Sequence, residues 1–309
     1  MKKFFKFMLF IIVFIILYLG LSYLFLPKDN LLKYGLYNTS SYEILGETPN
    51  TIDALVIGDS LVYSSISPME IYNKYGFTLY DCAEAALLVE DAYAHFEIAA
   101  DSQKPKIAIL EPNMFFRNPK KRPWYSKPTR VLKNSFPLIK YHNNWKKMVF
   151  NTKSHSWTNY YKGYKKNKDI KASFNYDYMH KNKISNKIPP GNMEYFKKFV
   201  SYCKKNNIEL MLISVPSQKS WSYEKHKTIE KLAKQYNITY LNLNLVEDLN
   251  IDWTKETKDK GDHLNFYGAQ KVSDYIGNYL KINNKLKSHK NEKGYEEWDK
   301  ALDYYLNTK

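Results

Sequence analysis

Three residues whose side chains could take part in catalysis lie far apart in this 309-residue sequence. Ser60 and Asn113 each come just after a short apolar run, and His263 lies in a polar loop near the C-terminus. A serine hydroxyl becomes an effective nucleophile when an imidazole removes its proton, and amide N–H groups can stabilise an oxyanion. These residue types therefore indicate acyl-transfer chemistry, provided that the fold brings them together.

The residues around Ser60 predict a strand followed by a sharp turn into a helix. Residues 54–57 are apolar and end at Gly58, as expected for a strand that is covered on both faces. A helix that begins just after Gly58 would direct backbone N–H groups towards the Ser60 hydroxyl. The alternative is an ordinary strand-to-helix turn in which Ser60 only caps the helix.

Strands and helices are expected to alternate along the rest of the chain, which predicts a three-layer α/β/α fold with a doubly wound, flavodoxin-like parallel sheet. Ligands of such sheets bind beyond the carboxyl ends of the strands, where Ser60 and Asn113 would both lie. The expected strands are residues 54–57, 77–82, 106–110, 208–215 and 238–243, and the expected helices are residues 67–75, 87–100, 193–206, 226–235 and 268–280.

The N-terminus predicts a membrane anchor. Residues 7–26 form a twenty-residue run without a charge, which is long enough to span a bilayer. Three lysines precede this run, so we expect the N-terminus in the cytoplasm and the rest of the chain outside the plasma membrane. A cleavable signal peptide is the main alternative, but the apolar run is long and no small-residue cleavage site follows it.

A basic insert is expected between the third and fourth strands. Residues 117–190 contain nineteen Lys and Arg against two Asp, while the net charge of the whole chain is +16, so the rest is close to neutral. A basic segment outside the cell favours an anionic wall polymer or the membrane surface as a partner, and argues against nucleic acid. The alternative is a general preference of this sequence for Lys, Asn, Ile and Tyr.

These expectations divide the chain into successive parts. The C-terminus should dock as a helix through Trp298, Leu302 and Tyr305, which recur at helical spacing. Cys82 and Cys203 are expected to be free thiols, and the histidines show no metal-ligand spacing. The assigned parts are the anchor at residues 1–27, a linker at 28–50, the α/β domain at 51–285 with its insert at about 117–190, and the docking helix at 286–309.

The candidate catalytic residues lie in segments that resemble the blocks of the SGNH (GDSL-like) hydrolase superfamily. Gly58-Asp59-Ser60 is similar to its first block, Asn113 stands where its third block has an asparagine, and His263, followed by LNFYGA, resembles its last block. The resemblance implies that Ser60 is the nucleophile and His263 the general base. It also implies that Ser60 N–H and the Asn113 amide stabilise the oxyanion, and that no cofactor is needed.

The sequence departs from the family pattern at three places. Glu111 replaces the usual glycine before Asn113, and the orienting acid and the second block also differ. The acid that orients the histidine commonly lies three residues before it, but that position is Lys260, so Asp259 and Asp262 are both candidates. Asp259 could reach His263 only if the loop turns through Gly261. The second block normally supplies a glycine N–H to the oxyanion hole, but residues 81–86 contain no glycine, so Ala83 or Ala86 would have to replace it.

A narrower resemblance points to a class of membrane-anchored SGNH proteins. The anchor, YHNNWKK at residues 141–147 and GDHLNFYGA at residues 261–269 look like the members that accompany membrane-bound O-acyltransferases, such as those of D-alanyl transfer to lipoteichoic acid. This resemblance implies an extracytoplasmic transferase or esterase that acts on acetyl or D-alanyl esters of a wall polysaccharide or teichoic acid. A hydrolase that only removes such esters remains open. So does a catalytically silent adaptor that binds the polymer or the acyltransferase.

Overall fold

The computed structural model describes residues 2–25, 40–118, 159–175, 177–180, 186–283 and 285–308. The chain divides into two units, of which one includes helix α1 (Lys2–Phe25) and the other, the α/β unit, comprises residues 39–117 and 158–309. By length and composition, α1 is apolar enough to cross a membrane. The predicted linker up to residue 39, most of the basic insert and the YHNNWKK segment lie outside the described residues.

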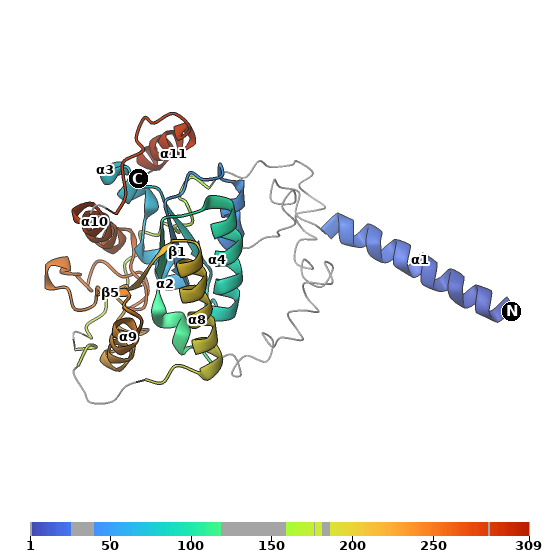
Figure 1. Ribbon diagram of the computed structural model, residues 1–309, viewed down its shortest axis with the longest axis horizontal. Coiled ribbons are helices and arrows are strands. Elements are labelled where there is room, and N and C mark those ends of the chain that lie inside the picture. Colours follow the sequence, from blue (N-terminus) through green and yellow to red (C-terminus); the bar gives the residue numbers. More distant parts are fainter. Residues whose placement is uncertain are drawn as a thin grey trace. The chain divides into compact units, whose positions relative to one another are not determined.

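The α/β unit is built on five parallel strands, as the sequence predicts. The strands are β1 (Ala54–Gly58), β2 (Leu79–Ala83), β3 (Ile107–Leu110), β4 (Glu209–Ser214) and β5 (Thr239–Asn242). Their order in the sheet is β2-β1-β3-β4-β5 (Figure 1). The winding reverses between β1 and β3, so the crevice at which ligands bind in such folds lies at the carboxyl ends of these two strands.

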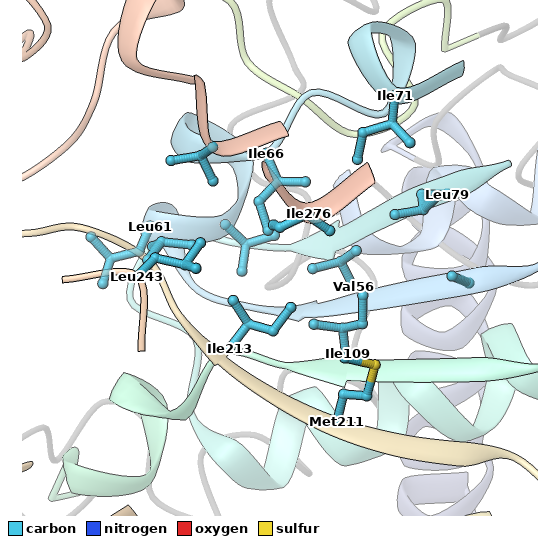
Figure 2. Packing of buried hydrophobic residues seen from close by; sticks show 14 of the residues in the cluster. Val56, Leu61, Ile66, Ile71, Leu79, Ile109, Met211, Ile213, Leu243 and Ile276 are labelled. Carbon is cyan, nitrogen blue, oxygen red and sulfur yellow. The ribbon is translucent and has the colours of Figure 1, made fainter. Parts of the chain in front are cut away.

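Helices cover both faces of this sheet. On one face lie α2 (Ser60–Ser65), α3 (Pro68–Tyr75) and α10 (Phe266–Ile282), and on the other lie α4 (Val89–Gln103), α8 (Pro190–Lys205) and α9 (Tyr223–Tyr236). On the first face, Val56 and Ile109 of the strands pack with Ile66 and Ile276 (Figure 2). Strand residues buried on both faces explain the short continuous apolar runs of the sequence.

Aromatic side chains join the helices of the second face. The rings of Phe96 in α4 and Phe199 in α8 have centroids 5.2 Å apart, and Phe196 of α8 lies 5.1 Å from Tyr236 of α9. These contacts make α4, α8 and α9 one layer, so the predicted three-layer doubly wound fold is confirmed. Cys82 and Cys203 are buried free thiols, as expected.

The C-terminal helix α11 (Glu296–Asn307) packs against α3 through Trp298, whose ring centroid lies 5.3 Å from that of Tyr72. Trp298 and Tyr305 are buried, and Leu302 is partly buried. A C-terminal helix therefore docks in the α/β unit, but it begins at Glu296, ten residues after the start of the segment 286–309 assigned to it. The helix also covers the buried Lys162, whose Nζ lies 4.7 Å from the Trp298 ring and which was expected to be part of the insert.

The α/β unit begins earlier than the sequence suggested. Lys162 is fully buried and pairs with Glu47 at 2.6 Å, and Glu47 follows the 3-10 helix η2 (Ser40–Gly46). Asn159 also donates a hydrogen bond to Glu43 at 2.6 Å. Residues 40–50, expected as linker, and residues 159–164, expected as part of the insert, thus pack together in this unit. A buried ion pair between distant segments leaves no local sequence pattern, which explains the difference.

Candidate active site

The turn after β1 is tight because Gly58 has no side chain. A Cβ atom at this position would lie 2.5 Å from Val62 Cγ2 and 2.8 Å from Glu111 Cβ, so a larger residue would clash on both sides. Asp59 then caps α2, since its Oδ1 accepts a hydrogen bond from Leu61 N at 2.9 Å. The cap is therefore Asp59 and not Ser60. Ser60 is the first residue of α2, and its hydroxyl is not used for capping.

Ser60 and Asp259 contact opposite nitrogens of the His263 ring. Ser60 Oγ lies 2.8 Å from His263 Nε2, and Asp259 Oδ2 lies 2.5 Å from His263 Nδ1. An ionised carboxylate can only accept hydrogen bonds, so the proton is on Nδ1 and Nε2 is free to accept the proton of Ser60. Burial alone would raise the pKa of Asp259, but hydrogen bonds from the ring and backbone of His263 outweigh it and lower the pKa. Asp259 is thus held as the anion that a histidine base requires.

A left-handed turn brings Asp259 back to His263. Lys260 and Gly261 have φ angles of 64° and 88°, and Gly261 N donates a hydrogen bond to Thr257 Oγ1 at 2.8 Å. His263 N also donates to Asp259 Oδ1 at 2.7 Å, so this carboxylate holds both the backbone and the ring. This is the turn through Gly261 that the Asp259 alternative requires.

Asp262, the other candidate acid, is directed elsewhere. Its Oδ2 lies 3.6 Å from His263 Nδ1, beyond hydrogen-bond distance, while its Oδ1 accepts a hydrogen bond from Ser220 Oγ at 2.6 Å. Asp259, Asp262 and His263 are nevertheless close enough together to hold a metal ion. In the ring tautomer that the Asp259 contact favours, however, His263 Nδ1 carries a proton and offers no lone pair to a metal. The geometry therefore favours Asp259 as the orienting acid.

Asn113 lies in the 3-10 helix η3 (Pro112–Phe116) that follows β3, and two charged side chains fix its amide. Its Nδ2 donates to Asp59 Oδ2 at 3.1 Å, and its Oδ1 accepts from Lys225 Nζ at 2.8 Å. Arg117 forms an ion pair with the same Asp59 oxygen. Since these bonds use the carbonyl oxygen and one N–H, the second N–H is the one that can serve an oxyanion.

Lys225 and Glu111 also belong to this site, and of the two only Glu111 stands out in the sequence, where it replaces the glycine usual before the asparagine. Lys225 lies in the first turn of α9, 112 residues from Asn113, and no local pattern marks it. Burial lowers the pKa of Lys225. Burial, and secondly the charge of Asp59, raises the pKa of Glu111 well above its usual value. This shift disfavours the charged form of Glu111, whose Oε2 accepts a hydrogen bond from Asn113 N at 3.1 Å.

The other expected oxyanion donors lie close to the turn after β1. Ser60 N–H has no acceptor among the described residues, whereas the N–H groups of Leu61 and Val62 both bond to Asp59. Ala83 ends β2 in register with Gly58, and Ala86 follows with a positive φ of 56°. The role of Ala83 or Ala86 as a second-block donor stays a prediction.

Comparison with known proteins finds similarity only at the level of structure. No family model matches the sequence, and no curated protein matches it. Among solved structures, a lipase/acylhydrolase from Enterococcus faecalis is similar with a TM-score of 0.42 and 12% identity over 77% of this chain and 98% of its own. A GDSL-like lipase from Bacteroides thetaiotaomicron is similar with a TM-score of 0.38 and 12% identity over 82% of this chain and 98% of its own. Values this low assign no activity to this chain.

Proposed function

We propose that this protein is a membrane-anchored serine esterase or acyltransferase of the SGNH type, in which Ser60 is transiently acylated. The observation that carries the proposal is the continuous hydrogen-bonded series from Ser60 Oγ through the His263 ring to Asp259. It lies at the carboxyl ends of the central strands, and the Asn113 amide is held beside it by Asp59. This arrangement meets the geometric requirements of a nucleophile, its base and the residue that orients the base.

The proposed reaction has two halves. Ser60 Oγ attacks the ester carbonyl carbon while its proton passes to His263 Nε2, and the oxyanion accepts hydrogen bonds from Ser60 N–H and the Asn113 amide. The C–O bond to the leaving alcohol then breaks, and His263 returns the proton to that oxygen. In the second half, water or an acceptor hydroxyl attacks the Ser60 ester with His263 as base, and Ser60 regains its proton as the product ester or acid leaves.

For the biological setting, we propose an extracytoplasmic enzyme that acts on acetyl or D-alanyl esters of an anionic wall polysaccharide or teichoic acid. The apolar helix α1 and the three lysines at its N-terminal end support attachment to the plasma membrane with this topology. The net charge of +16 supports an anionic polymer as substrate or acceptor. A membrane-bound O-acyltransferase is the proposed partner, on the resemblance of the anchor and of the segments at residues 141–147 and 261–269.

The test of the catalytic proposal is labelling by a fluorophosphonate probe, which reacts with activated serines. The full chain, purified in detergent, should be labelled, and Ser60→Ala and His263→Ala should each abolish the label. Ser64→Ala is a matched control, because Ser64 lies on the same helix and its Oγ contacts Lys258 rather than His263. An unlabelled wild-type protein with an intact fold would refute the enzyme and favour the adaptor.

A further inference from the structure

A cavity of about 390 Å³ opens beside the Asn113 amide, and its lining is strongly cationic. Asn113 and Ser220 form part of its wall. Four basic side chains contribute the charge: Arg117, Lys187, Lys219 and Lys225. No carboxylate is among its described lining residues. Such a concentration of positive charge in a concave site favours the binding of an anion.

Neutral oxygens, rather than carboxylates, hold two of these cations. Lys225 Nζ bonds to Asn113 Oδ1 at 2.8 Å and to Ser220 O at 2.6 Å, and the Lys219 ammonium bonds to the backbone oxygen of Asp259 at 3.1 Å. Arg117 is the exception, since it pairs with the fully buried Asp59. Among the residues that the structure describes, the cations of the cavity therefore exceed the carboxylates that pair with them, and a bound anion would correct this imbalance.

Two further carboxyl groups interact with Lys225 without cancelling this excess. Burial raises the pKa of Glu111 well above its usual value, which disfavours its charged form, and Asp262, which accepts a hydrogen bond from Ser220 Oγ, adds only one carboxylate beside four cations. The rings of Phe116 and Trp221 also lie 5.4 and 5.9 Å from Lys225 Nζ, so this ammonium is not an ordinary solvated surface lysine. A partly desolvated cation interacts more strongly with an anion than an exposed one does.

The cavity and the candidate catalytic residues share structural elements. Asn113 contacts Lys225 through Oδ1 and Asp59, the neighbour of Ser60, through Nδ2. On another side, Ser220 bonds to Asp262, the neighbour of His263. A group bound in the cavity would therefore lie beside an ester positioned at Ser60, and the two could belong to one molecule.

We infer that this cavity binds an anionic oxygen group, a phosphodiester or a carboxylate, carried by the ester on which Ser60 acts. The four basic residues would pair with the anion, while the ester carbonyl lies on the other side of the Asn113 amide. The link to the ester rests on the proposed function, but anion binding rests only on the cavity. Selection of an anionic substrate would thus be built into the α/β unit, where Lys219 and Lys225 act together with Arg117 and Lys187 from the two ends of the basic insert.

The test measures anion binding without any acyl chemistry. Inorganic phosphate and acetate are titrated by calorimetry into the full chain in detergent, on a Ser60→Ala background. At least one of the two anions should bind. Tighter binding of phosphate would indicate a substrate that carries a phosphodiester, and tighter binding of acetate would indicate one that carries a carboxylate. The double variant Lys187→Gln/Lys219→Gln should weaken binding by roughly tenfold for each lost charge-assisted contact, and Lys187→Arg/Lys219→Arg should retain it.

The matched control is Lys234→Gln/Lys300→Gln, which removes the same charge from exposed positions on α9 and α11. Affinity should be unchanged in this variant. No binding of either anion, or an equal loss in the control, would overturn the inference. Because the background lacks Ser60, failure of fluorophosphonate labelling would refute the proposed function without touching this result.

Discussion

Replacement of Asp259 by Asn gives the most informative perturbation of the site. Asp259 accepts two hydrogen bonds from His263, at 2.5 Å from the ring and 2.7 Å from the backbone. An asparagine can keep the backbone bond, but its NH₂ group facing Nδ1 would favour the ring tautomer with the proton on Nε2. That tautomer cannot accept the Ser60 proton. In serine proteases a comparable substitution slows catalysis about 10⁴-fold, which corresponds to about 5.5 kcal/mol of transition-state stabilisation.

The assay is the rate of fluorophosphonate labelling of the full chain, and Asp262→Asn is the matched control. Asp262 lies 3.6 Å from His263 Nδ1, and its hydrogen bond from Ser220 can be preserved by the asparagine oxygen. We expect labelling to slow by about 10³- to 10⁴-fold in Asp259→Asn and by less than about tenfold in Asp262→Asn. Equal rates in the two variants, or a slower rate in Asp262→Asn, would refute the assignment of Asp259.

Two further predictions concern stability. Both carboxylate oxygens of the buried Asp81 lack a partner among the described residues, and burial raises its pKa well above 3.8. The unfolded chain loses this proton above about pH 4, so the stability that Asp81 contributes is intact below that pH and falls as pH rises towards the folded pKa, by about 1.4 kcal/mol per unit. The free energy of unfolding, measured at about pH 5 and about pH 8, should show this decrease. Asp81→Asn should remove the part of the pH dependence that comes from Asp81, and an unchanged pH dependence in this variant would contradict the prediction. Lys162→Met leaves Glu47 buried without its partner and should cost about 3–5 kcal/mol, whereas Lys162→Met/Glu47→Leu should restore most of it. Chemical denaturation measures the free energy of unfolding of the single and the double variant. An equal loss of stability in Lys162→Met and Lys162→Met/Glu47→Leu would contradict this prediction and show that the ion pair itself is needed.

The sheet could be predicted from the sequence because its strands are short apolar runs separated by helices. Residues 54–57 and 106–110 contain almost no polar side chains, since both faces of the sheet are covered, and the alternation with helices then fixes parallel winding. Ser60, Asn113 and His263 were found for the same reason. Each follows or precedes a predicted element, and parallel topology brings the carboxyl ends of the strands together.

The remaining parts of the site depend on contacts between distant residues or on loop conformation. The choice between Asp259 and Asp262 is made by the left-handed turn at Lys260, and Gly261 was its only local signal. Lys225 reaches Asn113 from another helix, and a lysine in that position looks like any exposed lysine in the sequence. Lys162 is similarly hidden in a lysine-rich stretch, although it is fully buried.

The central claim is that Ser60 carries the acyl group, and direct detection of the acyl-enzyme tests it. The full chain is mixed with an activated acetate ester, quenched in acid, digested and examined by mass spectrometry. We predict one acetyl group, located on Ser60, that is absent from Ser60→Ala and accumulates less in His263→Ala. Acetylation at another residue, or none at all in protein that remains folded, would contradict the account.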